Sequence, residues 1–228
     1  MDELEVSQKK IFLSKEGDAF FNRYIAQMTS KEKGDLEDEV LAAIDQVKIE
    51  PQVVLEVGCS HGWRLNQIQK KYLSECYGFD PSERAISEGK KIYKDINLSI
   101  GTAEDSHSFG SRNYDLIIFG YCLYLCDRQD LFMIAANADK SLADKGFIVI
   151  WDYCSDVPYK NNYKHYEGLY SYKMQYSKLF DWNPAYTKVY SRTYKLDPGD
   201  PNPDNFVEVA VLMKNEKAAW FENPYKNT

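Results

Sequence analysis

Between residues 52 and 153, short apolar runs alternate with amphipathic stretches, and this alternation restricts the fold more than any other feature of the sequence. The apolar runs are QVVLEVG (52–58), CYGFD (76–80), INLSIG (96–101), YDLIIFG (114–120) and GFIVIWDY (146–153). Most of them are followed by apolar residues at helical spacing, which predicts βαβ units and a mainly parallel sheet with helices on both faces. Ligands of such α/β sheets bind at the carboxyl ends of the strands.

Three further segments flank this core of residues 51–153. Residues 1–50 carry apolar side chains near helical spacing, interrupted at Gly34-Asp35, and predict a cap of two helices. Residues 154–187 are rich in Tyr and Lys and predict a substrate-binding insertion, while residues 188–228 predict a terminal strand hairpin and tail. A chain of 228 residues suits one large domain, and we expect a single domain here.

The stretch VLEVGCSHG (54–62) joins the first expected strand to its helix. Gly58 and Gly62 permit a sharp turn and leave room for a ligand at the helix N-terminus, where free N–H groups favour an anionic group. Glu56, at the end of the strand, adds a negative charge that suits a ligand ammonium. Taken alone, the same glycines are also compatible with a tight turn that serves packing only.

Two more strand ends carry acidic residues. In GFDPSERA (78–85), Asp80 lies 22 residues beyond Gly58, where a carboxylate can accept both hydroxyls of a ribose. A helix cap followed by Pro81 is compatible with the same pattern. In GTAEDS (101–106), Glu104 or Asp105 could accept a hydrogen bond from an exocyclic amine such as that of adenine, although a solvated acidic loop has the same composition.

In this order and spacing, VLEVGCSHG, GFDPSERA, GTAED, YDLIIFGYCLYL and LADKGFIVIWDY resemble the class I S-adenosylmethionine-dependent methyltransferases. The resemblance covers about residues 35–153 and implies a Rossmann-like, doubly wound, mainly parallel seven-stranded sheet. It also implies S-adenosyl-L-methionine as the cofactor. One departure is Ser60, which replaces the middle glycine of the usual turn.

The resemblance assigns roles to the strand ends. The methionine end of the cofactor would lie over the first turn, the ribose at the second strand end, the adenine edge at the third, and the methyl sulfonium above the fourth. The residues so implicated are Glu56, Gly58, Cys59, Ser60 and Gly62; Asp80 and Pro81; Ala103 and Glu104; and Gly120 and Tyr121. More narrowly, KEGDAFFNRY, GYCLYLCD and YKHYEGLYSYKM are similar to methyltransferases of bacterial surface-polysaccharide gene clusters, which implies polysaccharide biosynthesis.

Charge is distributed unevenly along the chain. Residues 157–196 contain seven Lys or Arg against two acidic residues, while the whole chain carries a formal charge of −7. Nine of the eighteen tyrosines lie in the same segment. A basic, aromatic segment favours an anionic, ring-containing substrate such as a phosphosugar, a nucleotide sugar or a polysaccharide precursor. The overall negative charge argues against nucleic acid as a partner, and a lid or a homodimer contact is the plainer interpretation of the tyrosines.

The reaction itself leaves few marks in the sequence. Methyl transfer to a hydroxyl needs a proton acceptor, and His165, Asp152 and Tyr124 are the candidate catalytic residues near the expected transfer site. An exposed loop histidine, a turn cap and core packing are their structural alternatives. No carboxylate cluster suggests a metal, so we expect none. The predicted function is O-methylation of a small anionic or saccharide-type acceptor; nitrogen and carboxylate acceptors stay open.

Two other functions are compatible with a strand-end acid after a glycine turn. An NAD(P)-dependent oxidoreductase needs G-x-G-x-x-G, whereas this turn is followed by the bulky Trp63. A catalytically inactive cofactor-binding partner subunit would keep the cofactor residues alone. The five cysteines contain no CxxC pair and the N-terminus has no apolar segment, so we expect a cytoplasmic enzyme that does not bind membranes.

Overall fold

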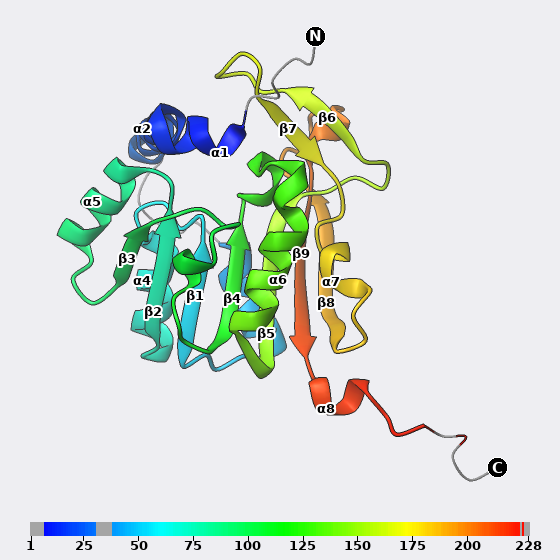
Figure 1. Cartoon of the computed structure of the whole chain (residues 1–228). Helices are drawn as coiled ribbons and strands as arrows, with labels where there is room; N and C mark the ends of the chain where they lie inside the picture. Colours follow the sequence, from blue (N-terminus) through cyan, green and yellow to red (C-terminus); the bar gives the residue numbers. More distant parts are fainter. Residues whose placement is uncertain (1–6, 31–37, 224, 226–228) are drawn as a thin grey trace.

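The computed structural model describes residues 7–30, 38–223 and 225. A seven-stranded sheet forms its centre, in the order β3-β2-β1-β4-β5-β9-β8 (Figure 1). The strands are β1 (Val53–Val57), β2 (Glu75–Asp80), β3 (Asn97–Ile100), β4 (Tyr114–Gly120), β5 (Leu142–Tyr153), β8 (Tyr186–Lys195) and β9 (Phe206–Lys214). The strands β3, β2, β1, β4 and β5 are mutually parallel, and β9 runs antiparallel between β5 and β8. The predicted α/β class with a mainly parallel seven-stranded sheet is confirmed.

Successive side chains of a strand point to opposite sides of the sheet, and the central strands carry buried apolar side chains on both sides. Helices therefore cover both faces of the sheet. On one face, Leu55 and Ile117 pack with residues of α6 (Leu131–Ser141) and α7 (Lys178–Asp181). On the other face, Val54 and Ile118 pack with residues of three helices. These are α3 (Glu39–Val47), α4 (Trp63–Tyr72) and α5 (Glu83–Ile92).

The N-terminal helices lie across the carboxyl ends of the parallel strands (Figure 1). They comprise α1 (Gln8–Ile11), the π-helical turn η1 (Phe12–Glu16) and α2 (Gly17–Ser30). Asp18 fastens α2 to the start of α5, because its carboxylate accepts hydrogen bonds from Ser82 Oγ at 2.7 Å and from the Arg84 N–H at 3.0 Å. The Gly34-Asp35 break predicted between the two helices of the cap lies outside the described residues.

The segment between β5 and β8 forms a separate two-stranded hairpin, β6 (Tyr159–Asn162) with β7 (Tyr170–Lys173), followed by α7. In Figure 1 this hairpin lies at the same end of the molecule as α1 and α2. Glu16 accepts a hydrogen bond from Arg23 of α2 at 2.5 Å and another from the Tyr163 hydroxyl at 3.0 Å. The bond to Tyr163 links the N-terminal helices to the insertion. After β9, the short helix α8 (Glu216–Ala219) leads into a tail that projects from the opposite end of the sheet.

Candidate functional site

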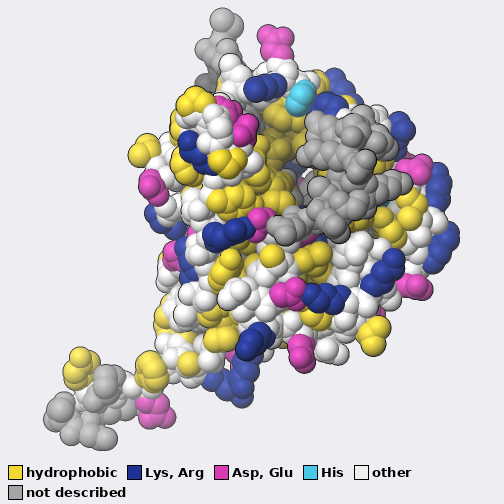
Figure 2. Space-filling model, turned by 180° about the vertical axis from the view of Figure 1, so that it is seen from behind, with side chains coloured by type: hydrophobic (Ala, Val, Ile, Leu, Met, Phe, Trp, Pro, Cys, Tyr) yellow, Lys and Arg dark blue, Asp and Glu magenta, His cyan; other side chains and the backbone are white. Residues whose placement is uncertain are grey.

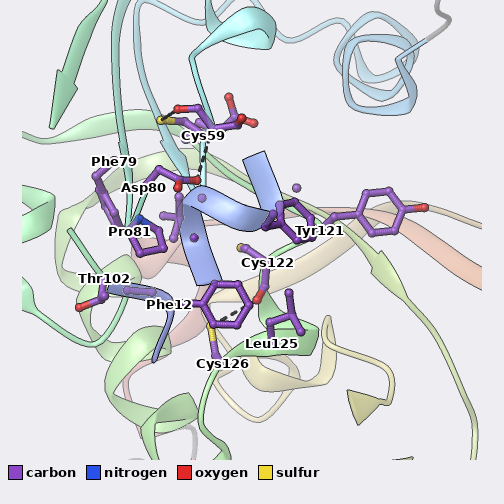
Figure 3. A pocket seen from close by; sticks show the side chains of 18 of the residues that line it. Phe12, Cys59, Phe79, Asp80, Pro81, Thr102, Tyr121, Cys122, Leu125 and Cys126 are labelled. Atoms are coloured by element: carbon purple, nitrogen blue, oxygen red, sulfur yellow. Dashed lines mark hydrogen bonds between the residues drawn. The ribbon is translucent and has the colours of Figure 1, made fainter. Parts of the chain in front are cut away.

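A cavity of about 600 Å³ opens at the carboxyl edge of the sheet, beneath α1 and α2, and its volume is in the range of small-molecule sites. In Figure 3, Asp80, Pro81 and Thr102 lie on one side of this cavity and Tyr121 on the other, with Phe12 between them. Most of the cofactor residues expected from the sequence line it. They are Glu56, Gly58, Cys59, Ser60, Asp80, Pro81, Ala103, Glu104, Gly120 and Tyr121.

The turn after β1 has a backbone that requires its glycines. Gly58 has φ +71°, and a Cβ there would lie 2.7 Å from Cys122 Cβ on the neighbouring strand end. Ser60 also has a positive φ, +52°, in the position where a glycine was expected. Gly62, with φ +83°, is the N-cap of α4 and lies outside the lining. Gly62 therefore shapes the turn, whereas Gly58 both shapes the turn and makes room for the Cys122 side chain beside the cavity.

Asp80 ends β2 with its carboxylate at the cavity. Its two oxygens accept the backbone N–H groups of Ser60 and Ser82, each at 2.9 Å. Burial raises the pKa of Asp80 to about 6, although both hydrogen bonds act in the opposite direction. The helix cap of α5 is Ser82, whose Oγ accepts the Ala85 N–H, so capping does not account for Asp80. Each oxygen keeps a lone pair for a ligand hydroxyl.

An ion triad lies beneath the glycine turn. Arg64 donates through Nε to both oxygens of Asp38, at 3.1 and 2.9 Å, and through Nη1 to Glu56 Oε1. Glu56 is 1% exposed, and its other oxygen, Oε2, has no hydrogen-bond partner. Burial raises the pKa of Glu56 to about 7, with the Arg64 charge acting in the opposite direction. A Cβ at Gly120 would lie 2.5 Å from Arg64 Nη1, so this glycine makes room for the triad.

The carboxylate at the third strand end is already engaged. Glu104 accepts a hydrogen bond from Thr102 Oγ1 at 2.8 Å and lies 3.4 Å from Lys9 Nζ. Asn137 Nδ2 donates to the backbone carbonyl groups of Ala103 and Glu104, at 3.2 and 2.9 Å. The backbone of this segment is therefore fixed at the cavity.

Aromatic side chains build the side of the cavity beyond Gly120. We call Tyr121, Tyr124, Trp151 and Tyr153 the aromatic wall, and all four line the cavity. The ring centroid of Tyr121 lies 4.5 Å from that of Trp151 and 5.6 Å from that of Tyr153; Tyr124 lies 4.9 Å from Tyr153. The Tyr121 hydroxyl is buried without a hydrogen-bond partner, and the residue has a positive φ of +54°. Strain of this kind in a non-glycine residue gathers at functional sites.

Of the three candidate catalytic residues, Tyr124 alone lines the cavity. Asp152 is 1% exposed and accepts backbone N–H groups from Leu123 at 2.9 Å, Tyr124 at 3.3 Å and Tyr153 at 2.7 Å. It holds the turn η3 (Leu123–Leu125) as a cap does. His165 is exposed, with its ring centroid 5.4 Å from that of Tyr163. Neither Asp152 nor His165 is in position to reach a molecule in this cavity as a base.

The cations of the basic segment also lie away from the cavity lining. Lys160 and Lys164 are exposed, Lys188 pairs with Glu208 and Arg192 with Glu39. Lys173 is buried, with Nζ 3.0 Å from the ring centroid of Tyr153, and burial lowers its pKa to about 8. The charge surplus of the segment therefore does not translate into a cationic pocket.

The cations of the described cavity lining, Lys9 and Arg64, are not among the residues predicted from the sequence. Arg64 follows Trp63 directly after the glycine turn, and no local pattern predicts its partners, which are the N-cap residue of α3 and a residue of β1. Lys9 pairs with Asp130 at 2.7 Å, a residue 121 positions away. Within the described ranges no group of three His, Cys, Asp or Glu side chains could hold a metal ion, and no helix there has the length and apolar character of a membrane span.

Comparison with known proteins places this site in a family. The sequence model of one family, described as a methyltransferase domain, matches residues 28–189. No curated protein sequence matches the chain. Because the family match covers most of the chain, the protein belongs to the methyltransferase-domain family.

Solved structures share the fold at low identity. The N1-methyltransferase of 1,6-didemethyltoxoflavin from Burkholderia thailandensis, solved with that compound and S-adenosylhomocysteine, is 14% identical with a TM-score of 0.68, covering 95% of this chain and 94% of that one. The N-methyltransferase NodS from Bradyrhizobium japonicum, in complex with S-adenosylhomocysteine, is 17% identical with a TM-score of 0.62, covering 87% and 98%. A TehB-like methyltransferase from Corynebacterium glutamicum is 15% identical with a TM-score of 0.61, covering 88% and 99%.

Proposed function

We propose that this protein is an S-adenosylmethionine-dependent methyltransferase that acts on a small molecule. One observation carries the proposal: a single cavity is lined by Glu56, whose Oε2 has no hydrogen-bond partner, by Asp80 and, across Gly120, by the aromatic wall. A nucleoside site and an acceptor site are thus continuous, as a direct transfer between two bound molecules requires.

The residues of the cavity fit this cofactor. Glu56 Oε2 is a buried acceptor without a partner, and the ammonium of the methionine moiety would satisfy it. Asp80 would accept the two ribose hydroxyls, while the backbone at Ala103 and the Glu104 carboxylate would border the adenine. Gly58 and Ser60, both with positive φ, give the turn the shape along which the chain between the ammonium and the ribose would run.

The turn itself and the residues beside it complete the cofactor contacts. Cys59 and Ser60 would contact the methionine chain, Pro81 the ribose, and Gly120 and Tyr121 the side toward the acceptor. When bound, S-adenosylmethionine supplies a methyl group activated by a positive sulfonium. The chain's own contribution is to hold the acceptor in line, to exclude water beneath α1 and α2, and to leave the cofactor charge beside carboxylates rather than cations.

The proposed acceptor depends on the residues that line the cavity and not on the composition of residues 157–196. The anionic, saccharide-type acceptor, O-methylation and the polysaccharide pathway depended on the basic segment and on a sequence likeness, and the cations of that segment lie outside the lining. We therefore retain methyl transfer to a small molecule from the predicted function, because the cavity supports this part. Trp63, which lines the cavity beside the turn, supports it against a dinucleotide-binding oxidoreductase.

Calorimetric titration tests this proposal. The full-length protein is titrated with S-adenosylmethionine, S-adenosylhomocysteine and NADH in the presence of EDTA. We expect micromolar binding of the first two and none of NADH. Binding of NADH alone would overturn the proposal in favour of the oxidoreductase. If the nucleosides bind but mixed acceptors never give S-adenosylhomocysteine release, the inactive partner subunit replaces the enzyme.

A further inference from the structure

The described lining of the cavity offers no unpaired cation to an acceptor. Lys9 and Arg64 are the cations of the described lining, and both are engaged in ion pairs with carboxylates. Tyr121 and the rest of the aromatic wall carry none. Figure 2 shows hydrophobic side chains gathered in the upper part of one face, with Lys and Arg scattered along its edges and over its middle and lower part. An anion moved into such a place loses its hydration without a counter-charge, which is costly.

A positive acceptor packed on the aromatic wall would lie near a cation that is already present there. The buried ammonium of Lys173 already lies over the ring of Tyr153, at 3.0 Å from its centroid, and 5.5 Å from the centroid of Tyr124. A second cation on the other side of these rings would meet this charge. An uncharged, flat, polarisable molecule avoids both costs and can pack against aromatic rings.

Neither Tyr124 nor His61 of the described lining offers a general base at the aromatic wall. The hydroxyl of Tyr124 has a pKa raised well above its ordinary value by burial. His61, the one described histidine in the lining, has its ring next to Phe21, Tyr24 and Tyr93, none of which belongs to the aromatic wall. A hydroxyl nucleophile would need to lose its proton here, whereas a neutral nitrogen attacks with its lone pair and needs no base in the transfer step.

One polar group of the aromatic wall awaits a partner. The Tyr121 hydroxyl is buried and unpaired, and the backbone around it is held by a hydrogen bond from the Tyr121 N–H to the Trp151 carbonyl at 2.8 Å. Trp151 is fixed in turn, because its Nε1 donates to the Tyr194 hydroxyl at 2.8 Å. The Tyr121 backbone and the neighbouring Trp151 are thus fixed, and a ligand packed on the aromatic wall would supply the hydrogen-bond partner that the Tyr121 hydroxyl lacks.

From these observations we propose that the acceptor is an uncharged, planar nitrogen heterocycle methylated on nitrogen, packed on the aromatic wall and hydrogen-bonded to the Tyr121 hydroxyl. The proposal rests on the proposed methyltransferase function. The nitrogen lone pair forms the new N–C bond while the C–S bond breaks and its electron pair stays on sulfur. Where another nitrogen of the ring carries a hydrogen, as in benzimidazole, the methylated cation then releases that proton to water.

Binding to the protein saturated with S-adenosylhomocysteine tests this inference. The probes are benzimidazole and quinoline, which are uncharged and planar at pH 7.5, against glucose 6-phosphate and UDP-glucose. We expect the heterocycles to bind in calorimetry and both anionic sugars to fail. Tyr121→Phe should weaken heterocycle binding by roughly 5- to 10-fold, as loss of one hydrogen bond does, and should change the affinity for S-adenosylhomocysteine by less than that. Tyr166→Phe, a tyrosine of the insertion outside the lining, is the matched control and should change neither.

The outcomes separate the two levels of inference. If S-adenosylhomocysteine itself does not bind, the proposed function fails and this inference fails with it. If it binds while the heterocycles do not, or while a phosphosugar binds instead, the cofactor assignment stands and the nitrogen-heterocycle acceptor is overturned. Equal weakening by Tyr121→Phe and Tyr166→Phe would likewise refute the role of the Tyr121 hydroxyl. With S-adenosylmethionine, mass spectrometry should detect the N-methyl product of benzimidazole.

Discussion

Replacement of Asp80 by asparagine should separate ligand binding from folding. If the carboxylate accepts both ribose hydroxyls, Asp80→Asn removes one charge-assisted hydrogen bond and leaves a neutral one in place of the other. Charge-assisted bonds contribute about 1.5–3 kcal/mol and neutral ones about 0.5–1.5 kcal/mol, so the total loss is about 3 kcal/mol. At 1.4 kcal/mol per factor of ten, the Kd for S-adenosylhomocysteine should rise roughly 100-fold.

The empty protein should tolerate this change. Burial raises the pKa of Asp80 to about 6, above its value in the unfolded chain, so its ionisation opposes folding as the pH rises through 3.8 to 6. At pH 7.5 loss of the charge therefore does not destabilise the fold by itself. The Asn amide can accept only one of the two backbone N–H groups, those of Ser60 and Ser82, so we expect the free energy of unfolding to fall by about 1–3 kcal/mol while the protein stays folded. Thermal unfolding without ligand checks this expectation, and calorimetry at pH 7.5 measures the Kd.

Asp105→Asn is the matched control. Asp105 is also a carboxylate after a strand end that accepts a backbone N–H, from His107 at 3.0 Å, but it lies outside the cavity lining. This variant should keep the wild-type Kd. If Asp80→Asn bound within threefold of wild type, or if both variants lost affinity equally, the ribose assignment would be refuted.

Three further predictions concern protons and packing. The pKa values of Glu56 and Asp80 are raised to about 7 and 6, so both carboxyl groups must lose their protons before they can bind the ligand as carboxylates. The affinity for S-adenosylhomocysteine should therefore fall from pH 7.5 to 5.5, and binding should release protons, which calorimetry in two buffers measures. An affinity that does not change with pH would contradict this prediction. Gly58→Ala should lower the free energy of unfolding by about 1–3 kcal/mol more than Gly168→Ala does, measured by chemical denaturation. Both glycines have a positive φ, but a Cβ would meet a neighbouring atom at 2.7 Å only at Gly58. Equal losses in the two variants would refute the packing argument. Burial lowers the pKa of Lys173 from 10.5 to about 8, so its charged form destabilises the folded protein below pH 8. Lys173→Met should therefore raise the unfolding temperature below pH 8, and this gain should fade toward pH 10.5. A lower unfolding temperature at every pH would contradict the prediction.

The sheet could be predicted because its information is local. Runs such as YDLIIFG are apolar on both faces, as strands of a parallel sheet must be, and Leu116 and Ile117 indeed face opposite cores. The glycine turn and Asp80 followed from the rule that parallel sheets bind ligands at their carboxyl edge. By contrast, the composition of residues 157–196 does not determine which way each lysine side chain points, and these side chains lie outside the cavity lining.

The ion triad and the fate of the candidate bases could not be read from the sequence. Asp38, Glu56 and Arg64 meet from three elements, and the pattern of none of them specifies the others. Asp152 has the position expected of a base at a strand end, yet η3 folds back and uses it as a backbone acceptor. Long-range packing decided these outcomes, and packing is not encoded in spacing along one strand.

A crystal structure of the protein with S-adenosylhomocysteine tests the central claim most directly. The account predicts the ribose hydroxyls on the Asp80 carboxylate, the amino group within hydrogen-bond distance of Glu56 Oε2, and the sulfur facing the aromatic wall past Gly120. A nucleoside bound elsewhere, or bound in this cavity with its amino group away from Glu56 and its ribose away from Asp80, would contradict it.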